Sequence, residues 1–298
     1  MTAHRVAVVM ITHNRRDEAL STLDRMARHS DAAPTIVVDN ASADGTADAV
    51  ARRHPEVTVM ALRENRGAAA RNLAVERAGT PYVAFCDDDT VWEDGSLAAA
   101  ADVLDRYPSI GAVMGRGLVE PELAEDPITP ELRHSPVPAP DWLPGPALLG
   151  VLAGFTMVRR RAFLDVGGFC PRIWLGGEEE LLSWDLAARG WWLCWAENVT
   201  VRHRPSAGRD SRHRRQLGIR NTLWTLWLRR PWRRALLRSA DLVASAPRDR
   251  ATLTAVGEAL RGLPWALRRR RVVPDGLERN LRLLEADRAH RTARSYTD

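Results

Sequence analysis

Three consecutive carboxylates, Asp87, Asp88 and Asp89, directly follow the apolar run at residues 82–86. Adjacent carboxylates repel one another, so such a cluster at the end of a buried segment is unfavourable unless a cation neutralises it. Carboxylate oxygens are hard ligands that suit Mg²⁺ or Mn²⁺. In an extended backbone Asp87 and Asp89 point to the same side, where one could meet a ribose and the other a metal. The alternative is a solvated turn before a helix that starts near Asp94.

A second acidic group, Glu178 to Glu180, follows two glycines at the expected start of a helix. The helix dipole alone favours acidic side chains at this place. One glutamate could instead act as a general base that removes the proton from an attacking hydroxyl. Trp174 offers a flat apolar face on which a sugar ring or another acceptor could stack, or it could serve packing alone.

Other polar residues also follow apolar runs or begin helices. Asp39, after residues 35–38, could accept from the imide N–H of uracil or thymine, or only shape the following turn. Arg66 and Arg71 bracket a helix start whose N–H groups favour anions, so they could bind a diphosphate or pair with surface carboxylates. His203, after residues 199–202, could complete a metal site or be structural.

The elements that must position these residues alternate between apolar strands and helical patterns. Strands are expected near residues 6–11, 35–38, 57–62, 82–86 and 110–114. This alternation indicates an α/β fold with a mostly parallel sheet covered on both faces, where ligands bind beyond the carboxyl ends of the strands. The absence of a Gly-x-Gly-x-x-Gly turn and of a Walker-type motif counts against dehydrogenases and P-loop enzymes.

The later part of the chain changes character. Residues 120–146 are rich in proline and acidic residues and predict a long surface loop. Strands are expected around residues 191–195 and 199–202. After residue 203 the pattern is all helical, with one apolar face at residues 223, 224, 227 and 228 and another at 253, 256, 260 and 263. We expect two units, residues 1–205 and a basic helical extension at 206–298.

Composition and charge limit the class of protein. Hydrophobic residues make up 45% of the 298 residues and charged residues 27%, as in soluble globular proteins. No stretch is long enough to span a bilayer and no signal peptide is evident, so a cytoplasmic location is expected. The widely spaced cysteines, Cys86, Cys170 and Cys194, indicate neither disulfides nor a zinc site.

The net charge of +5 is uneven, because arginine is concentrated after residue 202. A basic surface attracts nucleic acid, anionic lipid or a phosphorylated substrate. Residues 224–234 combine tryptophan with arginine, which is typical of a membrane interface, although a helix packed on the core with a basic edge would look the same.

Several motifs together resemble family 2 inverting glycosyltransferases. They are VVMITHNR at 8–15, VDNAS at 38–42, ENRG at 64–67 and DDD at 87–89, with GGF at 167–169 and GGEE at 176–179 on the acceptor side. Their order and spacing match over about residues 5 to 205. The resemblance implies a GT-A fold, a nucleotide-diphospho-sugar donor, a divalent cation (Mg²⁺ or Mn²⁺) and one in-line displacement that inverts the anomeric carbon.

The resemblance also implies residue roles. The donor-binding positions are Thr12, Asn14, Asp39, Arg66, Asp87 and Asp88. Asp87 and Asp89 form an Asp-x-Asp site, with Asp89 the direct metal ligand and His203 near the metal. Glu179 stands at the position of the base, with Glu178 before it. Trp174 is assigned to the acceptor from its flat apolar ring and its place beside these glutamates, not from the resemblance. Where many relatives continue with an acidic residue, leucine and then arginine, this chain has Leu181, Leu182 and Asp185.

The expected acceptor is a hydroxyl of a glycan, a lipid-linked molecule or a small molecule, with peripheral contact of the C-terminal helices to the inner face of the membrane and no nucleic acid. Two alternatives are a sugar-phosphate nucleotidyltransferase and a non-catalytic basic module that binds nucleic acid or membrane. The first alternative lacks its glycine-rich loop after the first strand.

Overall fold

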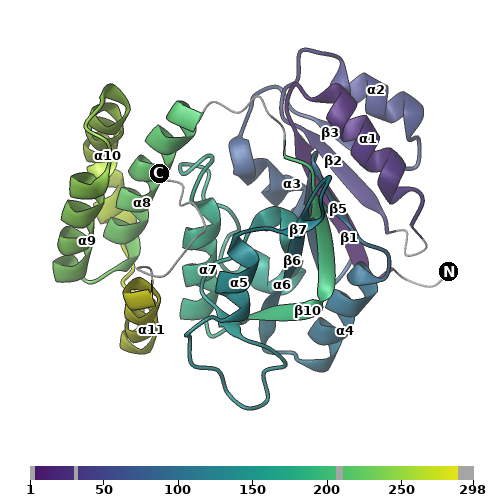
Figure 1. Ribbon diagram of the computed structural model, residues 1–298. Helices are drawn as coiled ribbons and strands as arrows, with labels where there is room; N and C mark the ends of the chain where they lie inside the picture. Colours follow the sequence, from purple (N-terminus) through teal and green to yellow (C-terminus); the bar gives the residue numbers. More distant parts are fainter. Residues whose placement is uncertain (1–3, 30–32, 206–210, 288–298) are drawn as a thin grey trace.

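The structure, a computed structural model, describes residues 4–29, 33–205 and 211–287. Figure 1 shows a central sheet flanked by helices, with the helices of the C-terminal part gathered at one side. The strands are β1 (Val6–Thr12), β2 (Thr35–Asp39), β3 (Thr58–Ala61), β4 (Tyr82–Asp87), β5 (Thr90–Trp92), β6 (Ile110–Val119), β7 (Ala124–Glu125), β8 (Ala147–Leu148), β9 (Thr156–Arg159) and β10 (Trp192–His203). The α-helices are α1 (Arg16–Met26), α2 (Thr46–Arg53), α3 (Ala70–Arg77), α4 (Ser96–Arg106), α5 (Ile128–Arg133), α6 (Arg160–Asp165), α7 (Glu178–Ala188), α8 (Ser211–Arg229), α9 (Trp232–Ser245), α10 (Arg250–Arg269) and α11 (Asp275–Asp287).

One sheet runs through the molecule in the order β3-β2-β1-β4-β9-β6-β10-β5, with β7 paired to β6 and β8 to β10. Strands β1 to β4 pair in parallel, as do β6 and β10. The shorter strands β5, β7, β8 and β9 pair antiparallel with their neighbours. The sheet is therefore mixed rather than mostly parallel, because β9 enters between β4 and β6 in the opposite direction.

The apolar run of β1 explains its central position. Its residues 6–10 are all buried, since β2 and β4 flank the strand in the sheet. A strand covered on both faces is expected to be apolar throughout rather than alternating. Figure 1 shows β1 to β3 between α1 and α2 on one side and α3 on the other. This packing fixes the carboxyl ends of β1, β2 and β4 at one edge of the sheet.

Two segments are more regular than the sequence predicts. Residues 120–146, expected as one long loop, contain β7 and α5. The two strands expected around residues 191–195 and 199–202 form a single strand, β10, whose register against β6 shifts between Trp195 and Thr200. A bulge of this kind lets a strand continue past the exposed polar residues Glu197 and Asn198.

Helix α8 connects the C-terminal helices to the sheet side of the molecule. It packs against α7, α9 and α10. On its α7 side, the Arg229 guanidinium donates to the Asp185 carboxylate at 2.5 and 2.8 Å. Figure 1 shows α9 and α10 beyond α8, at the edge of the molecule farthest from α1 and α2. The boundary expected near Ser206 lies outside the described residues.

Most of the expected membrane-interface segment at residues 224–234 lies inside the protein. Trp224 and Trp227 are buried. Arg230 is also buried, and its guanidinium donates to the Glu278 carboxylate on α11 at 2.6 and 3.0 Å. Trp232 at the start of α9 is exposed. The packing interpretation is therefore right for α8, and its tryptophans are not interfacial.

The apolar face expected on α10 is divided between the core and the solvent. Val256 and Leu263 pack partly buried against the core. Leu253 and Leu260 are exposed. The periodicity predicts the helix but not which leucines it buries.

No helix in the described part of the chain is long and apolar enough to cross a membrane. The cysteines are free, and Cys86 and Cys194 are buried. Burial raises the pKa of both thiols, that of Cys194 to about 12. Such thiols stay protonated at neutral pH and are chemically inert.

Candidate active site

The carboxyl ends of three neighbouring strands meet at one edge of the sheet. Thr12 of β1 is in register with Asp39 of β2, and Ile11 with Asp87 of β4. Thr12 and Asp39 are buried. The structure thus brings together three predicted site positions that are far apart in the sequence, because parallel strands end at the same edge.

The acidic triplet forms the turn after β4. The Thr12 hydroxyl donates to the Asp88 carboxylate at 2.9 Å, and Arg15 lies 3.0 Å from Asp88 and 3.4 Å from Asp89. Asp87 is the last residue of β4, and Asp88 and Asp89 lie in the turn. The Asp87 side chain is 39% exposed and that of Asp89 only 3%. The prediction that Asp87 and Asp89 share one side of an extended strand is therefore wrong, because the backbone turns between them.

Burial decides the electrostatics of this turn. It raises the pKa of Asp88 to about 7, although the Arg15 charge opposes the shift. Asp88 and Asp89 are both buried, which also argues against the alternative of a solvated turn. Helix α4 begins later, at Ser96 with Gly95 as its N-cap, so the triplet does not cap it.

A buried arginine connects the triplet to the second acidic group. Arg71, on α3, donates to the Asp87 carboxylate and lies 5.8 and 5.6 Å from the ring centres of Phe85 and Phe169. Its Nε and Nη1 atoms are buried without a hydrogen-bond partner. Burial raises the pKa of both Glu178 and Glu179, and the Arg71 charge opposes this rise. Arg71 is therefore the central positive charge between the two groups of carboxylates.

Glu178 and Glu179 begin α7, and both are buried. Burial raises the pKa of both, that of Glu178 to about 8 with a further contribution from the Glu179 charge. Glu179 accepts a long hydrogen bond of 3.4 Å from the N–H of Ala153. A dipole-stabilised surface position would leave these carboxylates in water, so burial favours a chemical role for one of them.

His203 ends β10 beside the triplet. Its Nε2 is 3.9 Å from the Asp89 carboxylate, and its Nδ1 is 3.7 Å from Asp126. Its ring meets Phe155 edge-on at 5.7 Å. The Arg204 N–H donates to the Asp89 carbonyl at 2.8 Å and holds the end of β10 against the turn. Asp126, which lies between β7 and α5, was not predicted from the sequence.

The residues near the triplet suit a divalent cation by chemical type. Asp87 and Asp89 supply carboxylate oxygens, and the Nδ1 atom of His203 is buried without a hydrogen-bond partner. Oxygen and imidazole ligands are both used by Mn²⁺ sites. Within residues 4–29, 33–205 and 211–287, however, no three acidic, histidine or cysteine side chains form a ready metal cluster. Arg15 and Arg71 also place positive charge beside the carboxylates.

The loops after β1 and β2 are tied to each other. Asn14, in a left-handed conformation, accepts from the Ala43 N–H at 2.7 Å. Asp39 accepts from the Ser42 N–H at 3.3 Å and from the Ser42 hydroxyl. The turn-shaping role considered for Asp39 is thus present in the structure, and it holds the carboxylate at the strand end.

Asn40, the polar residue that follows Asp39 at the end of β2, connects two loops at the candidate site. Its side chain is buried, accepts from the Arg66 N–H at 2.8 Å and donates to the Gly67 carbonyl at 3.0 Å. It therefore joins the end of β2 to the loop before α3. Arg66 itself is exposed and pairs with Glu64 at 3.0 Å.

Trp174 lies against the same loop. Its backbone carbonyl accepts from the Ala68 N–H at 2.7 Å, and its indole N–H donates to the Asn65 carbonyl at 3.3 Å. The residue is half-buried and left-handed, with φ of 66°. The loop before α7 is thereby fixed to the loop before α3, which places the donor-side and acceptor-side motifs next to each other.

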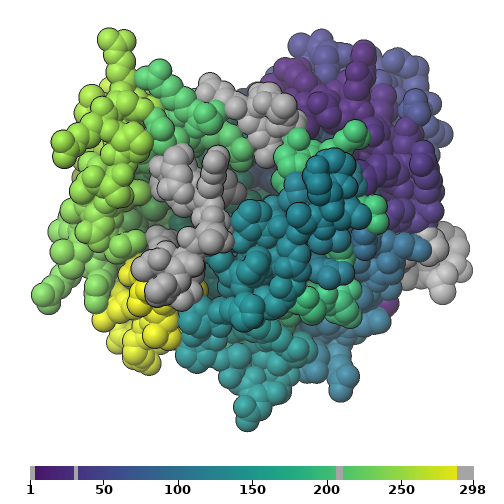
Figure 2. All heavy atoms as spheres, in the orientation of Figure 1, coloured from purple at the N-terminus to yellow at the C-terminus, as the bar shows by residue number. Residues whose placement is uncertain are grey.

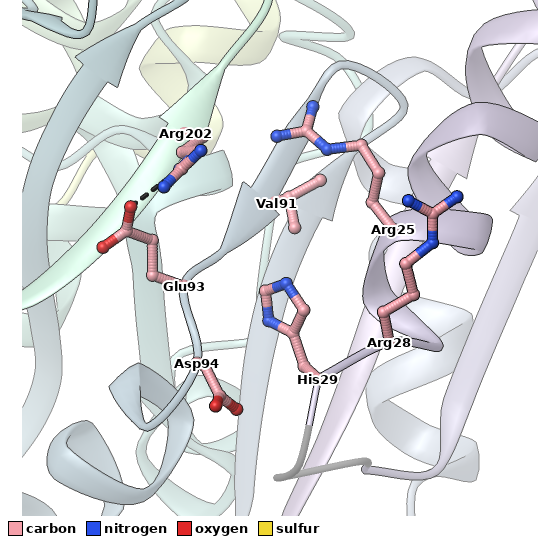
Figure 3. Close-up of a pocket in the computed structure, with 7 residues that line it drawn as sticks. All are labelled: Arg25, Arg28, His29, Val91, Glu93, Asp94 and Arg202. Carbon is pink, nitrogen blue, oxygen red and sulfur yellow. Dashed lines mark hydrogen bonds and ion pairs between the residues drawn. The ribbon is translucent and has the colours of Figure 1, made fainter.

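A polar cavity lies away from these residues. Figure 3 shows it between the end of α1 and the β5 region, with an ion pair of 2.7 Å between Arg202 and Glu93. Its volume is about 380 Å³. It is lined by Arg25, Arg28, His29, Val91, Glu93, Asp94 and Arg202. Because no predicted site residue lines this cavity, we assign the candidate site to the strand ends instead.

Comparison with known proteins agrees with this geometry. Residues 7–167 match the family model described as Glycosyl transferase family 2. The chain is 30% identical over 213 residues, covering 59% of this chain and 68% of the relative, to an N-acetylglucosaminyl-diphospho-decaprenol L-rhamnosyltransferase of Mycobacterium tuberculosis (strain ATCC 25618 / H37Rv).

Solved structures share the fold. The mannosyltransferase PcManGT from Pyrobaculum calidifontis, in complex with GDP-Man and Mn²⁺, aligns with a TM-score of 0.58 and 22% identity, covering 96% of this chain and 75% of that chain. GalNAc-T7 with UDP, GalNAc and Mn²⁺ aligns with a TM-score of 0.61 and 14% identity, covering 88% and 56%. The family match, which spans more than half of the chain, and the strand-end site lead to one conclusion. This chain belongs to glycosyl transferase family 2, and it is a nucleotide-sugar glycosyltransferase with a GT-A fold and a C-terminal helical region.

Proposed function

We propose that the protein is a metal-dependent, inverting glycosyltransferase that moves a sugar from a nucleoside diphosphate to a hydroxyl acceptor. The observation that carries this proposal is the presence of two acidic groups around Arg71, which donates to Asp87 in the first group and whose charge acts on Glu178 and Glu179 in the second. The turn at residues 87–89 is on the donor side, and Glu178 with Glu179 is on the other side. One group suits the charged leaving diphosphate and the other suits proton removal.

On the donor side, the strand-end loops bind the nucleotide. Asp39 accepts from the base, and Thr12 and Asn14 line the nucleotide beside it. Asp87 and Asp88 face the ribose and phosphates, with Arg66 at the exposed rim. This assignment is supported by the convergence of β1, β2 and β4 and by the hydrogen bonds that tie their loops together.

Asp89, Asp87 and His203 would hold Mg²⁺ or Mn²⁺. When bound, the cation would offset the negative charge that develops on the departing diphosphate. The donor chemistry of these three side chains supports the assignment, and Mn²⁺ is present in the PcManGT and GalNAc-T7 complexes. The Asp-x-Asp reading of the triplet belongs to this proposal.

On the acceptor side, Glu179 takes the proton from the attacking hydroxyl, and Glu178 is the second candidate. The hydroxyl oxygen forms a bond to the anomeric carbon while the bond from that carbon to the diphosphate breaks, and the diphosphate leaves with the electron pair. A raised pKa suits a general base that works near neutral pH. Trp174 would present its ring to the acceptor.

The acceptor is a glycan, a lipid-linked molecule or a small molecule. The similar mycobacterial protein is named for N-acetylglucosaminyl-diphospho-decaprenol, which supports the lipid-linked class. We place the enzyme at the cytoplasmic face of the membrane, in contact through its C-terminal helices. The unit at 1–205 would carry the chemistry, and 206–298 would be its extension.

Thermal shift with a panel of nucleotide sugars, each with Mn²⁺ and with Mg²⁺, tests this function, because a ligand that binds the folded state raises the melting temperature. We expect one nucleotide to stabilise the protein only when the cation is present. Asp89→Ala should lose the cation-dependent shift and sugar transfer together. Full transfer by Asp89→Ala would remove the metal site from the proposal.

A further inference from the structure

The outward faces of α9 and α10 carry large apolar side chains. Leu253, Leu260 and Leu267 are 74%, 55% and 48% exposed, and their spacing of seven residues places them in one row along α10. On α9, Leu236 and Val243 are also exposed and also seven residues apart. Each helix therefore presents an apolar row to the outside.

The inner face of α10 is made of small residues. The residues buried on this helix are Ala251, Thr252, Ala255, Ala259, Gly262 and Ala266. Gly262 is needed because a Cβ there would come within 2.5 Å of the Trp224 ring on α8. Packing inside the protein therefore uses mainly the small side of α10 and leaves Leu253, Leu260 and Leu267 exposed, although burying them would stabilise the fold more.

Arginines lie beside the apolar rows. By helical spacing, Arg250, Arg261 and Arg268 form the row next to the leucines of α10, and all three are exposed. Residues 232–271 contain ten arginines and three carboxylates, a net formal charge of +7, whereas the whole chain carries +5. Figure 2 shows α9 and α10, in light green, at an outer edge of the molecule.

We propose that this α9–α10 face docks on an anionic lipid surface and that the acceptor is lipid-linked, an inference that rests on the proposed function. Arginine beside a leucine row suits an interface where the apolar side chains enter the acyl region and the guanidinium groups meet phosphate. Nucleic acid would use the arginines but not the leucines. The exposed leucines beside the positive charge therefore favour an anionic bilayer.

Flotation of the full chain with vesicles tests the docking. We expect co-flotation with phosphatidylcholine–phosphatidylglycerol vesicles and about tenfold less with phosphatidylcholine alone. The double variant Leu253→Gln/Leu260→Gln and the double variant Arg261→Gln/Arg268→Gln should each lose binding. Leu283→Gln, which changes an exposed leucine on α11, is the matched control and should still float.

Failure to float, or equal flotation of all variants, would overturn the docking proposal. Sedimentation of the same proteins in solution tests whether a second copy covers this face. If the wild type is a dimer and the leucine variants are monomers, the face belongs to a second copy instead. Nucleotide-dependent thermal shift of the variants should be unchanged, so loss of docking is distinguishable from loss of the proposed function. Transfer to a lipid-linked acceptor should fall in the leucine variants while transfer to a water-soluble acceptor persists.

A separate observation concerns Asn221 on α8. Its side chain is fully buried, and its amide nitrogen lies 2.9, 2.8 and 2.6 Å from the carbonyl oxygens of Ile173, Leu175 and Gly176. The side-chain amide oxygen of Asn221 accepts from the Arg220 guanidinium at 3.0 Å. The Asn221 amide thus donates to three backbone carbonyls of the loop that leads to Glu178.

This loop contains one unfavourable backbone position. Trp174 is left-handed, with φ of 66°, whereas Gly176 and Gly177 adopt φ values of 85° and 87° that glycine allows. A left-handed tryptophan persists only where its surroundings hold it in place. We infer that Asn221 is a positioning residue that fixes this loop and therefore the orientation of Glu178 and Glu179.

Asn221→Asp tests this role. The variant keeps the shape of the side chain, but it replaces the NH₂ donor that faces the carbonyls with a carboxylate oxygen, which can only accept. We expect kcat to fall about tenfold or more while the KM for the nucleotide sugar is unchanged, as for loss of an interaction made in the transition state. Thr225→Val is the control, one turn away on α8, since the Thr225 hydroxyl is buried without a hydrogen-bond partner. Unchanged kcat in Asn221→Asp, or an equal rise in donor KM, would overturn the inference.

Discussion

At the scale of single residues, the two glutamates at the start of α7 are close in sequence and alike in burial, yet we assign them different tasks. Glu179 has a hydrogen bond from the Ala153 N–H, whereas the Glu178 Oε2 atom is buried without a partner. A base must be held in place, so Glu179 is the better candidate. Burial disfavours the charged form of Glu178 and raises its pKa to about 8.

Glu179→Gln should lower kcat by about 10²- to 10⁴-fold, the usual contribution of a general base. Donor binding, measured by thermal shift, should survive. The wild-type rate should fall as the pH drops through the raised pKa of Glu179, because only the deprotonated carboxylate accepts the proton. Glu180→Gln, in the same helical turn, is the control. Equal turnover of wild type and Glu179→Gln would transfer the role to Glu178.

Glu178→Gln should stabilise the fold in a pH-dependent way. Its pKa is raised to about 8 in the folded protein, mainly by burial, from an ordinary value of 4.5. The folded state then holds a proton that the unfolded state has lost, so wild-type stability declines as the pH rises from 4.5 toward 8. We expect a higher melting temperature for the variant at pH 8, by about 2–4 °C per kcal/mol gained, and little change at pH 4. A variant that melts lower at pH 8 would contradict this account.

At the scale of elements, the loops before α3 and α7 act as one unit. Gly67 has a φ of 56°, and a Cβ there would lie 2.2 Å from the Trp174 carbonyl oxygen. Only glycine therefore allows the Ala68 N–H to bond that carbonyl. The close approach connects the donor-side loop to the segment that carries the candidate base.

Gly67→Ala should lower the free energy of unfolding by about 1–3 kcal/mol, the range for a strained backbone position. It should also reduce transfer, because the two loops separate. Gly79→Ala is the matched control, since nothing lies within 4 Å of a Cβ at that position. Urea denaturation of the three proteins measures the difference, and equal midpoints for both variants would refute the contact.

At the scale of the whole molecule, the C-terminal helices pack against the structure around the site. The Arg229–Asp185 ion pair joins α8 to α7, and Asn221 holds the loop before α7. Arg172, in the same loop, stacks 5.1 Å from the Trp265 ring of α10. The division at residues 205 and 206 remains a prediction, and these contacts give it a measurable consequence.

A chain that ends at Ser206 should melt at a lower temperature than the full chain and lose transfer, because α7 would lose the helix that covers it. Circular dichroism during heating measures the change. Arg229→Ala, which removes one partly buried ion pair and leaves α8 in place, should have a much smaller effect. Retained melting temperature and transfer in the truncated chain would instead identify residues 206–298 as a separable extension.

The sequence by itself determined the family, the order of strands and helices in the N-terminal half, and the positions of the acidic groups. These are local signals: apolar runs that end in Thr12, Asp39 and Asp87 place those residues at one sheet edge wherever the strands are parallel. The motifs in residues 8–89 extend this reading to the donor side, and the family match confirms the class of enzyme.

Only the tertiary structure decided which groups are buried, which face outward and which distant residues support them. Asp88 and Asp89 lie in a turn, so the extended backbone expected at the triplet is absent, and β9 makes the sheet mixed. Asn40, Asp126 and Asn221 gain their importance from partners far away in the sequence. Trp224 on α8 and Leu260 on α10 both belong to apolar faces with helical spacing, yet Trp224 is buried and Leu260 is exposed. A helical pattern gives the spacing of a face, and only its packing partner determines the direction in which that face points.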